Sequence, residues 1–295
     1  MAKYNNQSTL ALMKQLNQQD IDICCSIYDY QFLTKKLIGF KYYKSDIERD
    51  FSSEELKRLK RDLNRLKELG VVEEDKNHSA VLYLTTAGVN VVREANDLQP
   101  NVITTSNQIL EKNYYRASKL RPKPHFLKRQ GFLNETVILI ENHLLKASGG
   151  AKIDFKSKHQ NHKEHSYEYK YIDQRHLANY YPYLDTLKPH GAFIVNESMI
   201  NSIMVLEDHL VKELSIKALL NKYVKPHLEL KQASNKEGLS ETLYLLVKND
   251  NQKLSAEPFL MRVKKDYEIE NFKIVLVTQF ELFENIGEQV SGFIG

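Results

Sequence analysis

The stretch Ser52–Gly70, SSEELKRLKRDLNRLKELG, has the residue pattern of an amphipathic helix. Its leucines recur at steps of three and four and so form one apolar stripe: Leu56, Leu59, Leu63, Leu66 and Leu69. Ser52 and Glu55 have the spacing of an N-terminal capping box, and Gly70 stands where a left-handed residue commonly ends a helix. We therefore expect a helix over residues 53–69.

Basic side chains crowd the early and middle turns of this helix, away from the leucine stripe: Lys57, Arg58, Lys60, Arg61 and Arg65. Val71-Val72 and Val81–Thr85 flank a polar tip, which predicts a short β-hairpin directly after the helix. A basic helix followed by a hairpin is the order of recognition helix and wing in a winged helix-turn-helix. The competing interpretation is a solvated charged helix packed on a hairpin; the order of the elements favours DNA binding.

The residues around this stretch complete a small helical domain. We expect a helix over 8–30, with Asp20 as a plausible start, and a second helix over 35–40 with Thr34 as its N-cap. A further helix follows from Thr86 to about Leu98. The sequence thus predicts a winged-helix DNA-binding domain over 1–98.

Composition limits the class of protein. A chain of 295 residues favours two domains, and 42% hydrophobic residues suffice for a packed core. The net charge of +4 is modest, so any nucleic-acid surface must concentrate positive charge locally. The two cysteines, Cys24 and Cys25, are adjacent and cannot join distant parts of a fold. With a polar N-terminus and no apolar run of membrane length, we expect a soluble, cytoplasmic protein.

The rest of the chain separates into a connector over 99–124 and a second domain over 125–295. The connector carries three prolines and a basic run, with a helix expected around 108–118. The second domain interleaves strands with helices, which predicts an α/β domain with a mixed central sheet and an α+β class for the whole chain. Its expected strands are 153–171, 192–195, 202–207, 242–247 and 273–278, and its expected helices are 132–145, 211–223 and 280–290.

Three places in the chain are similar to the replication-relaxation family of plasmids and integrative elements of Gram-positive bacteria. They are Asp20–Thr34; Leu59–Val72 with Tyr83–Gly88; and Lys188–Gly191 with Leu206–Asp208, Lys217, Tyr223 and Phe272–Thr278. The resemblance implies a winged helix followed by a restriction-endonuclease-like domain, and a role in plasmid replication or mobilisation.

The residues argue against catalysis by that second domain. A nuclease of this fold needs an Asp after the proline, then an acidic residue with a Lys two positions on, to hold Mg²⁺ and stabilise phosphate charge. Here His190 stands at the first position and His209 at the last, although Asp185, Glu207 and Asp208 offer carboxylates. We expect a fold kept for binding or dimerisation, without catalytic residues or a cofactor.

A histidine cluster offers a second possible metal site. His159, His162 and His165 are spaced three apart, so on a helix they would not converge on one ion, and neighbouring lysines would repel a cation from a loop. We therefore expect a polar loop and no metal.

The leading hypothesis is a sequence-specific, double-stranded-DNA-binding protein of a mobile element, acting in replication, transfer or transcriptional control. Arg58, Arg61 and Arg65 are the candidate base readers, because guanidinium pairs with guanine bidentately. The candidate phosphate contacts are Lys57 and Lys60 on the helix and Lys76 and His78 on the wing. A homodimer is expected, because one helix reads few base pairs. The alternatives are a metal-dependent nuclease or nicking accessory, and an adaptor that docks a relaxase or replication initiator.

Overall fold

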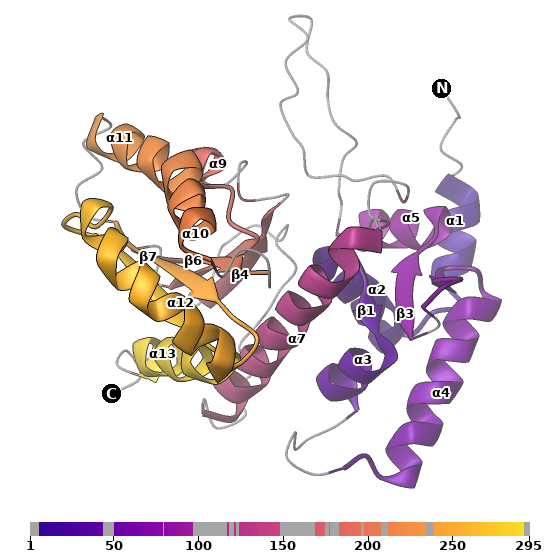
Figure 1. Ribbon diagram of the computed structural model, residues 1–295. Coiled ribbons are helices and arrows are strands. Elements are labelled where there is room, and N and C mark those ends of the chain that lie inside the picture. The colour runs from indigo at the N-terminus through magenta and orange to yellow at the C-terminus, as the bar shows by residue number, and fades with distance from the viewer. Residues whose placement is uncertain are drawn as a thin grey trace, which may run out of the picture. The chain divides into compact units, whose positions relative to one another are not determined.

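The computed structural model describes residues 6–43, 50–78, 80–96, 117, 121, 124–147, 169–174, 177, 183–195, 198–207, 212–233 and 239–291. The described residues form two compact units, one up to Ile138 and the other from Leu139 onward. The first contains a three-stranded antiparallel sheet and the second a mixed five-stranded sheet, so the expected α+β class is confirmed (Figure 1). Among the described helices, none has the length and apolar character needed to cross a membrane.

The first unit packs helices around a small sheet. Its elements are α1 (Asn6–Met13), α2 (Gln18–Tyr30), β1 (Leu33–Thr34), α3 (Lys35–Tyr42), α4 (Ser53–Glu68), β2 (Val72–Glu74), β3 (Val81–Leu84) and α5 (Thr86–Ala95). Strand β3 lies between β1 and β2 and is antiparallel to both. The core is made by fully buried side chains from both helices and strands, including Ile23, Ile27, Leu33, Ile38, Leu66, Leu82, Leu84 and Val89.

The prediction of one helix over 8–30 was wrong, because the chain breaks between α1 and α2. Asn17 caps α2: its side chain accepts a hydrogen bond from the Asp20 N–H, and the Asp20 carboxylate accepts one from the Asn17 N–H. Asp20 is therefore the third helical residue and not the helix start. The local capping box overrides a continuous apolar pattern here.

Helix α4 forms where it was predicted. Ser52 and Glu55 make the capping box, and Gly70 has a φ of 67°, in the region that favours glycine. The leucine stripe is only partly correct. Leu59, Leu63 and Leu66 are buried, but Leu56 in the first turn is 49% exposed and Leu69 is half-buried.

The base of the hairpin is joined to α5 by Thr85 and Gly88. Thr85 Oγ1 donates to the Gly70 carbonyl at 2.6 Å and accepts from the Gly88 N–H at 3.1 Å, which caps α5. Gly88 lies so close to the hairpin that a Cβ at this position would be 2.1 Å from the Val71 carbonyl oxygen. Only glycine allows this approach of helix and strand.

Helix α7 (Pro124–Ala147) contributes its first part to this unit. The buried Asn134 donates two hydrogen bonds from Nδ2, to the Tyr30 carbonyl at 3.1 Å and the Phe32 carbonyl at 2.8 Å. These bonds satisfy the backbone where the chain leaves α2. The helix expected over 132–145 therefore begins earlier, and the connector expected before it lies almost entirely outside the described residues.

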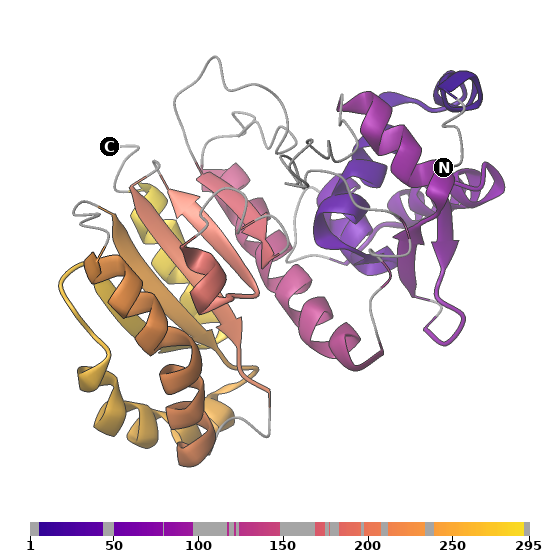
Figure 2. The same cartoon turned by 90° about the horizontal axis from the view of Figure 1, so that it is seen from above.

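The second unit is built on the mixed sheet. Its elements are β4 (Tyr169–Asp173), α9 (Leu184–Leu187), β5 (Gly191–Val195), β6 (Met199–Val205), α10 (Glu213–Leu219), the π-helix η2 (Leu220–Val224), α11 (Lys225–Ala233), β7 (Ser240–Leu246), α12 (Asp250–Val263), the 3₁₀-helix η3 (Lys264–Asp266), β8 (Phe272–Val277) and α13 (Gln279–Ser291). The strands lie in chain order, β5 is antiparallel to both neighbours, and β6, β7 and β8 are parallel. Helices α10, α11 and α12 cover one face of the sheet, and α13 packs on the other (Figure 2).

Two helices of this unit differ from expectation, and both contain proline. The helix expected to end at Tyr223 continues through η2 into α11, and Pro226 follows the π-helical turn inside this continuous helical run. Helix α12 was not predicted. Its N-cap Asn249 accepts from the Gln252 N–H, and Pro258 lies on an exposed side of its interior. The proposed strand residues 153–168, the histidines within them, and all of the helix expected over 108–118 except Ala117 lie outside the described part of the chain.

A buried ionic group ties α11 to the start of strand β7. Glu241, at the start of β7, accepts hydrogen bonds from His227 Nε2 at 2.7 Å and Lys231 Nζ at 2.8 Å. Lys231 also donates to the Leu239 and Asn271 carbonyls. Burial alone would raise the pKa of Glu241, but the hydrogen bonds from His227 and Lys231 outweigh it and hold this pKa below its ordinary value. The group therefore stabilises the unit only while Glu241 is ionised.

We predict that Gly88→Ala lowers the free energy of unfolding by about 1–3 kcal/mol or more, because the new methyl group meets backbone that cannot move aside. Gly131→Ala in α7 is the matched control, since its Cβ would lie 3.9 Å from the Phe32 ring, an ordinary contact. That variant should be about 0.5–1 kcal/mol more stable, because alanine is favoured inside helices. Urea unfolding followed by circular dichroism measures both. Equal stability of the two variants would contradict the packing argument.

Glu241→Gln should lower the free energy of unfolding by about 1–3 kcal/mol at neutral pH, because a neutral amide loses two charge-assisted hydrogen bonds. The stabilisation from Glu241 is fully present above the ordinary pKa of 4.5 and is lost as the pH falls through the lowered pKa of the folded state. The difference between wild type and variant should therefore shrink in acid. Urea unfolding at a series of pH values measures it, and a pH-independent difference would refute the assignment.

Candidate nucleic-acid interface

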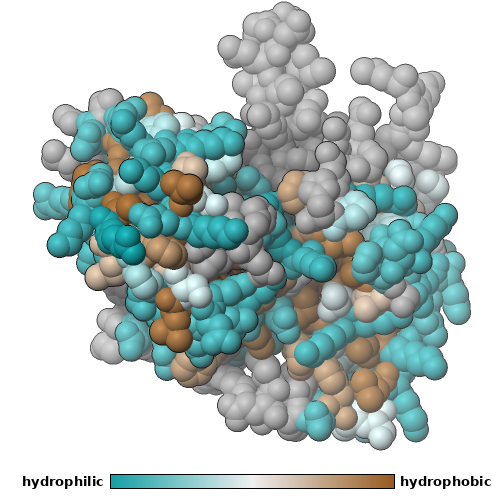
Figure 3. All heavy atoms as spheres, viewed as in Figure 1, coloured by the Kyte–Doolittle hydropathy of each residue, from teal (hydrophilic) through white to brown (hydrophobic). Residues whose placement is uncertain are grey.

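The rotation of α4 about its axis is set by its buried residues. Leu59, Asp62, Leu63 and Leu66 face the first unit's interior. Because an α-helix turns once in about 3.6 residues, Lys57, Arg61 and Asn64 lie on the opposite side. Lys57 and Arg61 are exposed and Asn64 is half-buried. This outward face is mostly hydrophilic (Figure 3). Asn64 was not among the predicted DNA-binding residues, because a single asparagine gives no sign of facing DNA until the rotation of the helix is known.

Arg65 holds α4 against α2. Its Nη2 donates to the fully buried Asp20 carboxylate at 2.6 Å and lies 3.6 Å from Asp62. The hydrogen bond to Asp20 raises the pKa of Arg65 further above its ordinary value. The side chain that sequence analysis assigned to base reading is thus engaged in an ion pair inside the unit, with 36% of it exposed.

Asp62 is the second acceptor in this network. It takes a hydrogen bond from the Tyr43 hydroxyl at 2.9 Å and one from Arg61 Nε at 3.0 Å. Burial works to raise the pKa of Asp62, but the bonds from Arg61 and Tyr43 outweigh it and lower the pKa. Burial, followed by the bond to Asp62, raises the pKa of Tyr43. Asp20 and Asp62 are therefore anionic anchors that fix α4 to α2 and to the end of α3.

The remaining basic residues of α4 are directed to solvent. Lys57, Arg58 and Lys60 are exposed, and within the described part of the chain they form no ion pair. Arg61 keeps 68% of its side chain exposed despite its bond to Asp62. The structure thus groups Lys57, Arg58, Lys60 and Arg61 along one solvent-facing surface.

The hairpin tip is a compact turn built on Asp75. The Asp75 carboxylate accepts from the Asn77 N–H at 2.9 Å and contacts His78 Nδ1 at 3.1 Å. Burial works to raise the pKa of Asp75, but the bonds from Asn77 and His78 lower it below the ordinary range. Lys76 and His78 are both exposed, so the turn presents basic side chains at the tip.

Ion pairs link the hairpin to its neighbours. Glu74 Oε1 lies 2.8 Å from Lys35 Nζ of α3 and 2.8 Å from Lys67 Nζ of α4, and the pKa of Glu74 is lowered by these lysines. Arg121 pairs with Glu73 and lies over the Tyr83 ring, 4.7 Å from its centroid. The hairpin is therefore held in a definite orientation beside α4.

In the second unit, the position where a nuclease of the expected fold carries Asp holds His190. Its Nδ1 accepts a hydrogen bond from the Val205 N–H at 3.0 Å. Asp185 is exposed, Glu207 follows β6, and Asp208 and His209 lie outside the described residues. Where the chain is described, no three metal-binding side chains come together.

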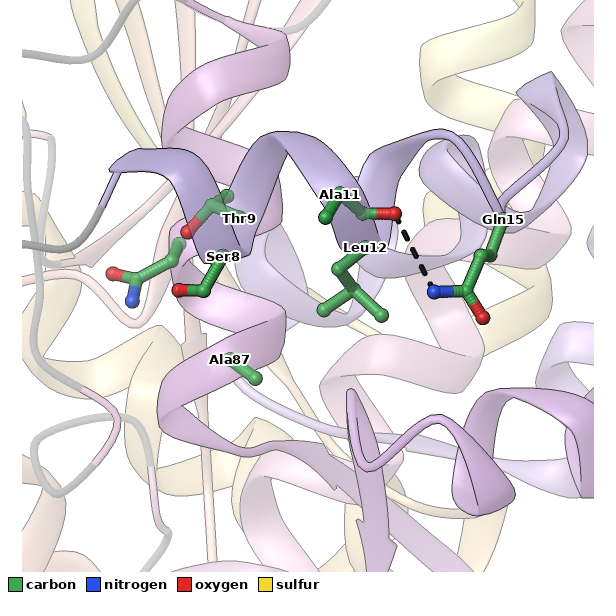
Figure 4. Close-up of a pocket in the computed structure, with 7 residues that line it drawn as sticks. Ser8, Thr9, Ala11, Leu12, Gln15 and Ala87 are labelled. Atoms are coloured by element: carbon green, nitrogen blue, oxygen red, sulfur yellow. Dashed lines mark hydrogen bonds between the residues drawn. The ribbon is translucent and has the colours of Figure 1, made fainter.

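A pocket lies between α1 and α5 in the first unit (Figure 4). It is lined by neutral side chains only: Ser8, Thr9, Ala11, Leu12, Gln15, Ala87 and Asn90. Gln15 turns back to donate to the Ala11 carbonyl at 3.4 Å. The lining offers no charge to bind a phosphate or a metal, and the basic surface of α4 remains the better candidate.

Comparisons of the chain with known protein families, with curated proteins and with solved structures found no match.

Arg65→Ala should lower the free energy of unfolding by roughly 1.5–3 kcal/mol, the range for a hydrogen bond to a charged group, because it leaves the Asp20 carboxylate buried without its cation. Arg58→Ala, on an exposed side of the same helix, should change stability by no more than about 0.5 kcal/mol. Chemical unfolding of both variants tests this. A similar loss in the two would mean that Arg65 is not an anchor.

Proposed function

We propose that the chain is a sequence-specific, double-stranded-DNA-binding protein whose first unit is a winged helix-turn-helix. Its elements follow the order helix, short strand, two helices and hairpin, with the short strand paired to the hairpin. In this proposal α3 and α4 are the helix-turn-helix, α4 is the recognition helix and residues 75–80 form the tip of the wing.

The observation that carries the proposal is the outward face of α4. Lys57, Arg61 and Asn64 lie opposite the buried side, with Arg58 and Lys60 beside them. These are the side chains that bind phosphates and base edges: Lys contacts phosphate, Arg pairs with guanine and Asn with adenine. Arg65 is assigned to anchoring the helix, so Arg61 becomes the leading candidate for base recognition. Its bond to Asp62 would hold the guanidinium in place before DNA binds.

The hairpin supports the same proposal. Lys76 and His78 project from a turn whose backbone is fixed by Asp75, and the hairpin is tied to α3 and α4 through Glu74. A wing held in this way could place both side chains against the phosphate backbone while α4 occupies the major groove.

For the second unit we propose a restriction-endonuclease-like fold without nuclease activity. The strand order and the single antiparallel strand β5 inside an otherwise parallel set support the fold. His190, engaged with the Val205 backbone where an acidic metal ligand would be needed, supports the lack of catalysis. The resemblance to replication-relaxation proteins makes a plasmid or another mobile element the proposed source of the DNA site.

We predict that the full chain selects a preferred sequence from a pool of random DNA duplexes. Arg61→Ala should weaken binding to the selected site by about 1–3 kcal/mol and reduce discrimination against other sequences. Lys57→Ala should weaken binding to all sequences and reduce the slope of affinity against salt by about 0.9. Fluorescence anisotropy over a salt series measures both effects.

Lys217→Ala is the matched control, because Lys217 is an exposed lysine of the second unit. Its affinity and salt slope should equal those of the wild type. If the pool yields no preferred sequence and Lys57→Ala behaves like the control, α4 is not a DNA-binding helix. The first unit would then be better explained as an adaptor for a relaxase or replication initiator.

A further inference from the structure

Helix α12 carries an unusual exposed stripe. Asp250, Leu254, Pro258, Met261 and, just after the helix, Lys265 recur at steps of three and four and are all exposed. Leu254 is 68% exposed and Met261 is 54% exposed. In Figure 3 hydrophobic side chains lie among hydrophilic ones over α12. Two exposed apolar side chains alone would need no explanation. The arrangement of the charged residues around them does need an explanation.

When the direction of the helix is reversed, four of the five stripe residues fall opposite a complementary residue of the stripe, and Pro258 falls opposite Glu257. Leu254 and Met261 are equally far along the chain from the midpoint between Glu257 and Pro258, and so are Asp250 and Lys265. In the described part of the chain, neither Asp250 nor Lys265 forms an ion pair. If a second α12 packs antiparallel on the first, each Asp250 meets a Lys265 and each Leu254 meets a Met261. A two-fold axis makes both contacts twice.

The neighbouring basic side chains do not oppose this pairing. The antiparallel arrangement also brings Lys253 near Arg262 of the second copy, but each already has an acidic partner within its own chain. Lys253 pairs with Glu281 of α13, and Arg262 Nη1 lies 3.5 Å from Glu213 of α10. Beside these acids are two more exposed apolar side chains, Leu214 at 82% and Phe280 at 66%.

We propose that α12 is the contact surface between two copies of this chain, packed antiparallel about a two-fold axis that passes near Glu257 and Pro258. The matched positions of acid, apolar residue and base favour a second copy over a different partner, which would need no such symmetry. A membrane surface is disfavoured because the acidic Glu257 lies beside the middle of the stripe. The dimer does not depend on DNA binding, but it would join two DNA-binding units, as two-fold-symmetric operators require.

Sedimentation velocity of the full chain without DNA tests the proposal. The wild type should show a concentration-dependent monomer–dimer equilibrium, and Leu254→Glu should raise the dissociation constant by at least about tenfold. Leu230→Glu on α11 is the matched control, because Leu230 is also exposed, at 46%, but lies away from the stripe. Its dissociation constant should be that of the wild type.

Charge reversal provides a second, more specific arm. Asp250→Lys and Lys265→Asp should each weaken self-association, because every contact then joins like charges. An equimolar mixture of the two variants should form a heterodimer with an affinity near that of the wild type, since both contacts again join opposite charges. Recovery in the mixture also shows that neither variant is merely misfolded.

Glu257→Gln should tighten the dimer, because the two Glu257 side chains lie near each other beside the axis.

A wild type that remains monomeric at every concentration would overturn the proposal, as would a mixture that fails to recover or equal effects of Leu254→Glu and Leu230→Glu. These measurements contain no DNA. Their failure would leave the proposed DNA binding untouched, and loss of DNA binding would leave the dimer untouched.

Discussion

The first unit depends on the ion pair between Arg65 of α4 and the buried carboxylate of Asp20 in α2. A carboxylate removed from water needs a cation and hydrogen-bond donors, and here Arg65 and the Asn17 N–H provide both. Together with the buried side chains of Leu59, Leu63 and Leu66, this ion pair holds α4 in its rotation about its axis. Lys57 and Arg61 lie about two turns and one turn before Arg65, and both remain exposed to solvent. The proposed DNA-reading face is thus a consequence of how the helix is anchored.

The hairpin is positioned by a different kind of constraint, the close approach of two backbone segments at Gly88 and Val71. Thr85 joins them through its hydroxyl, which bonds the end of α4 at Gly70 and the start of α5 at Gly88. The side chain of Thr85 thus links the end of the proposed recognition helix to the base of the wing. A wing that moved relative to α4 would have to break these bonds, so the basic tip and the basic helix face form one preorganised surface.

In the second unit the ionic groups lie at the margin of the sheet and the apolar groups fill its faces. Glu241 accepts from His227 and Lys231, while Lys231 also binds the backbone beside β7 and β8. These contacts close the end of the sheet covered by α11. Helix α12 packs one side against the unit and exposes the stripe residues on its other side.

The sequence by itself determined the local structure of the first unit. The capping box at Ser52 and Glu55, the glycine after α4 and the alternation of helix and hairpin depend on neighbouring residues, and such short-range interactions are legible in the residue order. It also determined the mixed character of the second sheet. Two kinds of prediction were wrong. The single helix expected over 8–30 is interrupted by the local cap at Asn17, and prolines led to the omission of α12 and of the continuation into α11.

Only the tertiary structure decided which charged residues support the fold and which face solvent. Arg58, Arg61 and Arg65 are equivalent in the sequence, since each is an arginine on one basic helix. They differ because Asp20, which lies 45 positions before Arg65, is buried beneath one of them. The palindromic stripe on α12 became visible only when its exposure was known. Long-range burial and ion pairing depend on contacts between distant segments, and the order of residues along the chain does not contain that information in a readable form.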